Sequence, residues 1–169
     1  ITLDGEYKQG GFNGKVALDD PNGSIYLNGD VNVSSRIPTF NFQAIINKLR
    51  PHDLNLTSKY PDTEFSLKLR ANFTGGSVDE MIGEINVDSL EFMSPEKQYF
   101  MNNMNIRASK QNNENQLRLT SEFLTASVEG KFQYHTLPAS ILNIMRKYVP
   151  SLILPPKKPI ETHNNFQFD

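Results

Sequence analysis

Three histidines and the adjacent carboxylates Asp19 and Asp20 are candidates for metal or acid–base chemistry. His52, His135 and His163 are far apart in the chain, and none has a second ligand at a spacing typical of zinc sites. Asp19 and Asp20 stand directly before a Pro-Asn-Gly triplet, which is typical of a solvated turn. Glycine-rich phosphate loops and the Gly-x-Ser-x-Gly motif are absent from the sequence. We therefore expect a protein that is not an enzyme and that needs no metal or cofactor.

The charge and composition of the chain narrow the possible partners. The 169 residues include 17 basic and 19 acidic side chains, spread without runs of like charge, for a net charge of -2. This balance does not favour binding to nucleic acid. There are no cysteines, and no stretch approaches the roughly 20 apolar residues of a membrane-spanning helix. The length suits one domain with its own core.

A five-residue unit built around a glycine recurs along the chain. The glycine has an apolar residue two positions before and after it, and a charged residue follows it directly. Because side chains alternate between the two faces of a strand, each of these glycines is predicted to lie on an apolar face. A glycine there either marks a bulge that bends the sheet or leaves room for a facing wall or a bound chain. The five copies are residues 3–7, 12–16, 27–31, 81–85 and 128–132.

Almost all of the secondary structure predicted from the sequence is strand. Alternating β-branched and aromatic residues between Asn, Asp, Gly and Pro clusters predict about ten strands, which favours an antiparallel meander, a sandwich or a solenoid. Ser77 and Glu80 match a capping box and predict one helical turn. An amphipathic pattern predicts a helix over residues 139–149. We expect a β-rich segment over residues 1–153, followed over residues 154–169 by an extended connector and the start of another strand.

The predicted strands share one broad apolar surface. Composition alone favours the interior of a sandwich that a second sheet closes. The opposite strand positions are almost uniformly polar, however, so a single sheet with one apolar face must fold over itself or accept a ligand. The residues predicted to line this surface are Val16, Leu18, Leu27, Val31, Val33, Phe40, Phe42, Phe65, Leu67, Leu69, Ile85, Val87, Val128 and Phe132.

The order of these motifs and turns resembles the TamB translocation and assembly module family of Bacteroidota, within the AsmA-like superfamily. The resemblance is carried by residues 12–22, 27–33, 38–42 and 83–92, with the Leu137-Pro138 helix start behind them. It implies an elongated, strongly bent sheet, called a β-taco, whose apolar interior is an open groove. It also implies a periplasmic location, an inner-membrane anchor in the full-length protein, and roles in lipid transport and outer-membrane protein assembly. It transfers no catalytic residues.

The resulting hypothesis is that the chain is a fragment of a longer bridge between two membranes. Acyl chains of phospholipid or another lipid would lie along the apolar face, while an outer-membrane barrel assembly protein would be a partner of the full-length chain. Two alternatives remain: a scaffold that binds barrel proteins by strand addition, and a structural spacer with a closed interior. The helix is expected to plug or floor the groove with Ile141, Ile144, Met145, Tyr148 and Val149.

Overall fold

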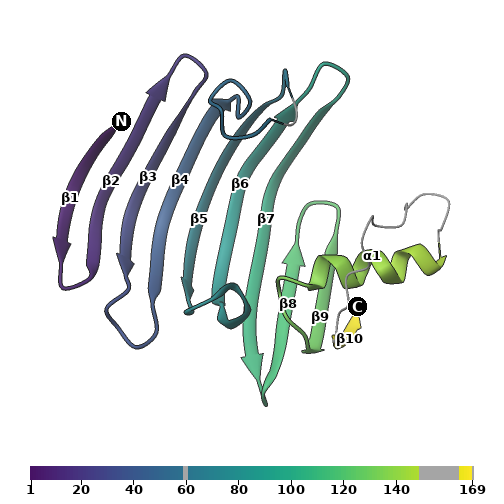
Figure 1. Cartoon of the computed structure of the whole chain (residues 1–169). Helices are drawn as coiled ribbons and strands as arrows, with labels where there is room; N and C mark the ends of the chain where they lie inside the picture. Colours follow the sequence, from purple (N-terminus) through teal and green to yellow (C-terminus); the bar gives the residue numbers. More distant parts are fainter. Residues whose placement is uncertain (59–60, 149–163, 169) are drawn as a thin grey trace.

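A computed structural model describes residues 1–58, 61–148 and 164–168 as one antiparallel sheet with two helical segments (Figure 1). The sheet has ten strands, and their spatial order is their order in the sequence. Each strand therefore pairs with its neighbours in the chain, so the predicted antiparallel meander is confirmed. The elements are β1 (Thr2–Lys8), β2 (Gly11–Asp20), β3 (Gly23–Asn32), β4 (Thr39–Leu49), β5 (Glu64–Thr74), the 3-10 turn η1 (Val78–Glu80), β6 (Ile82–Met93), β7 (Gln98–Gln111), β8 (Glu114–Thr120), β9 (Thr125–Lys131), α1 (Leu137–Tyr148) and β10 (Asn165–Phe168).

Several connections are tight turns built from the expected residues. Pro21 and Asn22 alone join β2 to β3, and the backbone N–H of Asn22 donates to the Asp20 carboxylate at 2.9 Å. Asn112 and Asn113 join β7 to β8 with positive φ angles of 51° and 64°, which asparagine tolerates better than most residues. Asp20 thus serves as a turn residue, as its Pro-Asn-Gly context predicts.

The register of the sheet places the apolar residues on one face. Residues directly opposite each other in an antiparallel pair point to the same side, so their partners can be followed from strand to strand. On the polar face of the sheet, one such row contains Lys15, Asn28, Gln43 and Arg70. One apolar row runs through Val16, Leu27, Ala44, Leu69, Val87 and Met104, and the next through Leu18, Ile25, Ile46, Leu67, Leu90 and Met101.

Two irregularities in the register accompany the curvature of this open sheet. Between Ile46 and Leu49, β4 contains an extra residue relative to β5, and the N–H of Lys48 donates to the Ser66 hydroxyl at 3.0 Å. In β6, Asp88 has no opposite residue on β5, and its carboxylate binds the Arg70 guanidinium at 2.8 Å. Bulges of this kind bend a strand and increase its twist. The sheet is curved and is not closed into a barrel (Figure 1).

The predicted boundaries differ from the structure mainly at strand ends. We expected strands over residues 117–123 and 124–134, but β8 and β9 are separated by a turn in which the Ser121 N–H donates to the Leu124 carbonyl at 2.7 Å. β9 ends at Lys131, and Phe132 lies just beyond it in a buried cluster. The helical turn at η1 forms, but the Ser77 side chain makes no capping hydrogen bond. Most of the expected connector lies outside the described residues.

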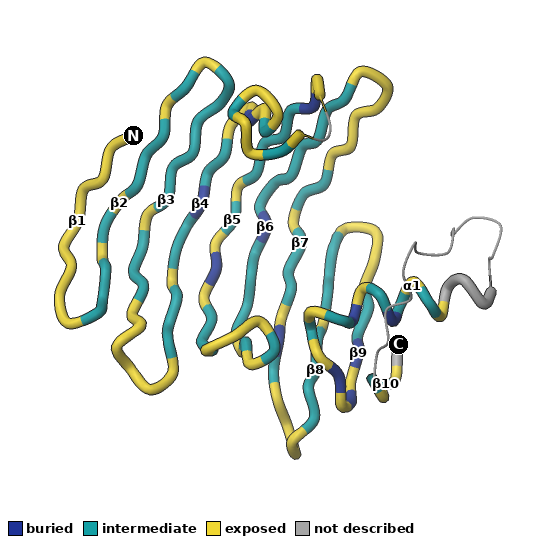
Figure 2. The backbone as a smooth tube through the Cα atoms, viewed as in Figure 1, coloured by how far each residue is buried: buried dark blue, intermediate teal, exposed yellow. Residues whose placement is uncertain are grey.

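Among the described residues, a buried hydrophobic cluster surrounds the start of α1. Val128, Phe132 and Leu137 form a buried cluster, against which Leu117, Tyr134, Ile141 and Phe166 pack. These residues come from β8, β9, β10, the turn after β9 and the helix, so the beginning of α1 lies against the apolar face at the β8–β10 end. Elsewhere most strand residues are only partly buried (Figure 2).

Candidate functional site

One hydrogen-bonded pair of titratable residues joins two segments that are distant in the sequence. The ring nitrogen Nδ1 of His135 lies 2.6 Å from Oδ2 of Asp79, and the backbone N–H of His135 donates to Oδ1 at 3.1 Å. Burial raises the pKa of the Asp79 carboxyl, but the hydrogen bonds from His135 outweigh this effect and hold that pKa below its ordinary value of 3.8. No local sequence pattern reveals this pair, because the two residues are 56 positions apart.

The Asp79–His135 pair connects η1 to the turn between β9 and α1. The neighbouring Tyr134 ring belongs to the packing around the buried cluster, and burial followed by the charge of Asp79 raises the pKa of its hydroxyl. The pair is therefore well placed to hold this turn against the sheet. Within the described parts of the chain, no three His, Asp or Glu residues are grouped so that they could hold a metal ion.

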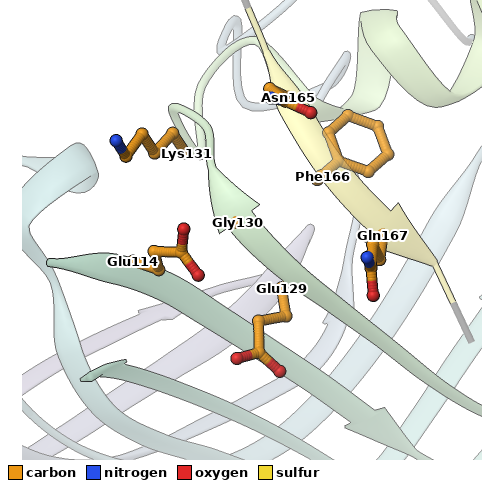
Figure 3. A pocket seen from close by; sticks show the side chains of 7 residues that line it. All are labelled: Glu114, Glu129, Gly130, Lys131, Asn165, Phe166 and Gln167. Carbon is orange, nitrogen blue, oxygen red and sulfur yellow. The ribbon is translucent and has the colours of Figure 1, made fainter. Parts of the chain in front are cut away.

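A polar hollow lies at the β8–β10 end of the sheet (Figure 3). It has a volume of about 300 Å³. Glu129 and Lys131 alternate along β9 with the apolar-face residues, so this hollow belongs to the polar side of the sheet. Its mixture of acid, base and amide groups is what a solvated strand surface contains. The lining residues are Glu114, Glu129, Gly130, Lys131, Asn165, Phe166 and Gln167.

The residues predicted to line an apolar surface fall on the common apolar face, with two exceptions at strand ends. Val33 lies just beyond β3, where its side chain is 57% exposed. Phe132 lies just beyond β9 and is buried in the cluster beneath α1. The remaining predicted residues lie in strands: Val16, Leu18, Leu27, Val31, Phe40, Phe42, Phe65, Leu67, Leu69, Ile85, Val87 and Val128.

A trough crosses the apolar face where three glycines are neighbours. Gly5, Gly14 and Gly29 lie opposite one another on β1, β2 and β3, and we call this row the glycine trough. The row beside it on one side contains Phe12 and Val31. A hollow of about 220 Å³ opens at the trough, lined by Phe12, Gly14, Val16, Leu27, Asn28, Gly29, Val31 and Phe42.

The glycines of the repeated unit are required by the adjacent strand. Gly83 has a φ of 142°, and a Cβ atom there would lie 2.2 Å from the carbonyl oxygen of Asn72 and 2.5 Å from Cα of Phe73. Gly29 makes the same approach to Asn41 and Phe42. Both lie in continuous register, so the bulge interpretation is wrong for them. The close backbone of the neighbouring strand is enough to explain glycine at both positions, without room for a facing wall or a bound chain.

A second hollow marks the border between the open and covered parts of the apolar face. Its volume is about 130 Å³. Tyr134 contributes to it from the turn before α1, so this turn reaches over the sheet beyond β8. The other lining residues are Phe73, Met81, Gly83, Glu84, Ile85, Ile106, Ala108 and Leu117, from β5 to β8 and the η1 connection.

The helix covers only one end of the apolar face. Ile141 packs on the buried cluster, whereas Ile144 is 43% exposed. The side chains of Met145 and Tyr148, and all of Val149, lie outside the described residues. Within the described chain all strands belong to one sheet, so the sandwich interpretation is wrong. No second sheet covers the apolar face of β1 to β6 in the described residues, although Leu49 at the end of β4 is buried next to the β4–β5 connection.

Comparison with known proteins yields no relative for this chain. No protein-family model, no curated protein sequence and no solved structure matches it. None of the helices among the described residues is long and apolar enough to cross a membrane.

Proposed function

We propose that the apolar face binds the acyl chains of phospholipids and that the chain is one section of a lipid-conducting bridge. The observation that carries this proposal is the apolar face of a sheet that has no second layer over β1 to β6 in the described residues. Strands spaced about 4.8 Å apart make the face from β1 to β7 roughly 29 Å wide. One acyl chain spans half of the hydrocarbon core of a bilayer, about 15 Å, and would fit across it.

The chemistry of this face favours an acyl chain over a peptide. The strand backbones are paired with one another in the ladder, and the rows on this face are built from aliphatic and aromatic side chains. A peptide lying on such a surface would bury polar backbone groups without partners, which is costly. An acyl chain has no such groups, and each buried methylene contributes about 0.8 kcal/mol. The lipid head group would remain in water at the edge of the apolar face.

We place this activity in the cell envelope on the basis of the sequence resemblance to TamB. In that setting, the full-length protein is anchored in the inner membrane, crosses the periplasm and carries lipid toward the outer membrane, where a barrel assembly protein is its partner. An open apolar face is what such a conduit requires. A purely structural spacer has less support, because a closed interior would need a second layer over the sheet, and the described strands all belong to a single sheet.

Photocrosslinking tests the proposal directly. A photoreactive residue is introduced at Val31 or Leu67 on the apolar face, and at Asn32 or Lys68 on the exposed polar side as matched controls. The purified chain is then mixed with phospholipid vesicles. We expect lipid adducts at the first two positions and few at the controls. Equal labelling at all four positions would contradict an apolar lipid site.

A charge-insertion variant gives an independent measurement. Leu67→Asp with Leu69→Asp should abolish lipid capture, because two carboxylates would have to lose water beneath the acyl chain. Lys68→Asp with Asn72→Asp adds the same number of carboxylates to the opposite side of β5 and should leave capture unchanged. Circular dichroism verifies the fold of both variants. A folded Leu67/Leu69 variant that captures lipid normally would rule the proposal out.

A further inference from the structure

The sheet contains a free internal edge because β7 is twice as long as β8, the strand that follows it. β7 has 14 residues, while β8 has 7. β8 pairs with residues 105–111 of β7, whereas the preceding part of β7 pairs with β6. Figure 1 shows the β8–β9 hairpin beside only the lower part of β7. Among the described residues, no strand pairs with the other edge of residues 98–104.

The turn between β8 and β9 closes one end of this free edge. The side-chain amide of Asn103 donates to the Glu122 carboxylate in that turn at 3.4 Å. Asn103 also has a φ of 52°. Two residues, Asn102 and Asn103, separate Met101 from Met104 on the apolar face, where a regular strand would have one. The regular part of the edge is therefore residues 98–102. We call this edge, together with the adjoining β8–β9 turn, the β7 notch.

Large apolar side chains at the notch are unusually exposed. Tyr99 is 58% exposed and Phe100 is 63% exposed. They point to opposite faces, since Tyr99 pairs with Phe92 on the apolar side and Phe100 with Glu91 on the polar side. Phe123 and Leu124 in the turn are 73% and 50% exposed. By contrast, no large apolar side chain in β2 to β6 is more than half exposed among the described residues.

We propose that the β7 notch is a docking site for a short extended segment of another polypeptide, which adds to β7 as an antiparallel strand. The unpaired N–H and C=O groups of a strand edge select a backbone of the same kind, which an acyl chain does not have. The guest would continue the line of β8 beyond its turn. The turn limits it to about five residues, roughly 17 Å. Alternate guest side chains would meet Tyr99 on one face and Phe100 on the other, so apolar residues suit both sides.

Hydrogen exchange measured by NMR on the whole chain tests this assignment. The probe is a nine-residue peptide of alternating valine and threonine between terminal lysines. The control peptide is N-methylated at two adjacent central residues, which blocks hydrogen bonding along both of its edges. We expect the probe to slow amide exchange within residues 98–102 and the control to bind at least about tenfold more weakly. Equal binding of both peptides would overturn the proposal.

Matched variants locate the site on the sheet. Tyr99→Thr with Phe100→Thr keeps residues suited to strands but removes both rings, and it should weaken probe binding. Tyr7→Thr removes a ring that is 71% exposed on the edge strand β1 and should have no effect. Protection that falls on β1 or β10 contradicts the notch. A further possible result is protection of residues 98–102 that increases with protein concentration in the absence of peptide. That result would show that a second copy of the chain occupies the notch, and it would overturn the proposal of a different polypeptide.

Discussion

Replacing Gly83 with alanine separates two explanations for the recurring glycines. A Cβ atom at this position would lie 2.2 Å from the Asn72 carbonyl oxygen. That oxygen belongs to β5, which is paired on both sides and cannot easily move. The backbone conformation of Gly83 costs other residues about 1–3 kcal/mol, and overpacking costs about another 1–3 kcal/mol. The free energy of unfolding should therefore fall by about 2–6 kcal/mol, a large part of the roughly 5–15 kcal/mol typical of a domain.

Urea unfolding followed by circular dichroism measures this loss. Gly76→Ala is the matched control, because Gly76 is exposed and its nearest neighbour is the flexible Glu80 carboxylate at 3.1 Å from the added Cβ. The control should change the free energy of unfolding by no more than about 0.5 kcal/mol. Lipid crosslinking at Val31 is measured on both variants in parallel.

The refuting result is specific. If Gly83→Ala unfolds with a free energy within about 1 kcal/mol of the original chain but loses lipid capture, the glycine keeps space for a bound chain. The adjacent strand would then not be the reason for glycine at this position. A large loss of stability in Gly76→Ala would also contradict the reasoning, because that site has no comparable backbone contact.

Two further predictions concern the packing around α1. The side chain of Asn164 donates to the hydroxyls of Ser140 at 2.7 Å and Thr136 at 3.0 Å. Asn164→Ala should therefore lower the free energy of unfolding by about 1–3 kcal/mol and speed amide exchange in β10. Unchanged exchange in β10 would contradict this role of Asn164. Because the pKa of Asp79 is lowered in the folded chain, its stabilising effect should be present above about pH 4 and lost as the pH falls through that pKa. The stability difference from Asp79→Asn should therefore shrink between about pH 5 and pH 2 in urea titrations; a constant difference would show that ionisation of Asp79 is not coupled to folding.

Most of the sheet follows from local patterns. Period-two alternation in segments such as residues 65–73 specifies a strand and its apolar face, since neighbouring side chains must point to opposite sides. Turn residues such as Pro21 and Asn22 specify where strands end. The ends of β8 and β9 were predicted less well, because Phe123 and Phe132 continue a plausible strand pattern. Their positions depend on a turn and on a buried cluster that involve other segments.

The strands, the apolar face and the glycines on it could be predicted from the amino-acid sequence, because each depends on residues only a few positions apart. The absence of a second sheet within the described chain, and the packing of α1 and of the turn before it on the β8–β10 end, depend instead on tertiary contacts. The Asp79–His135 pair and the β7 notch likewise arise from strand order and from unequal strand lengths. Alternation specifies which side of a strand is apolar, but what covers that side depends on contacts between distant parts of the chain.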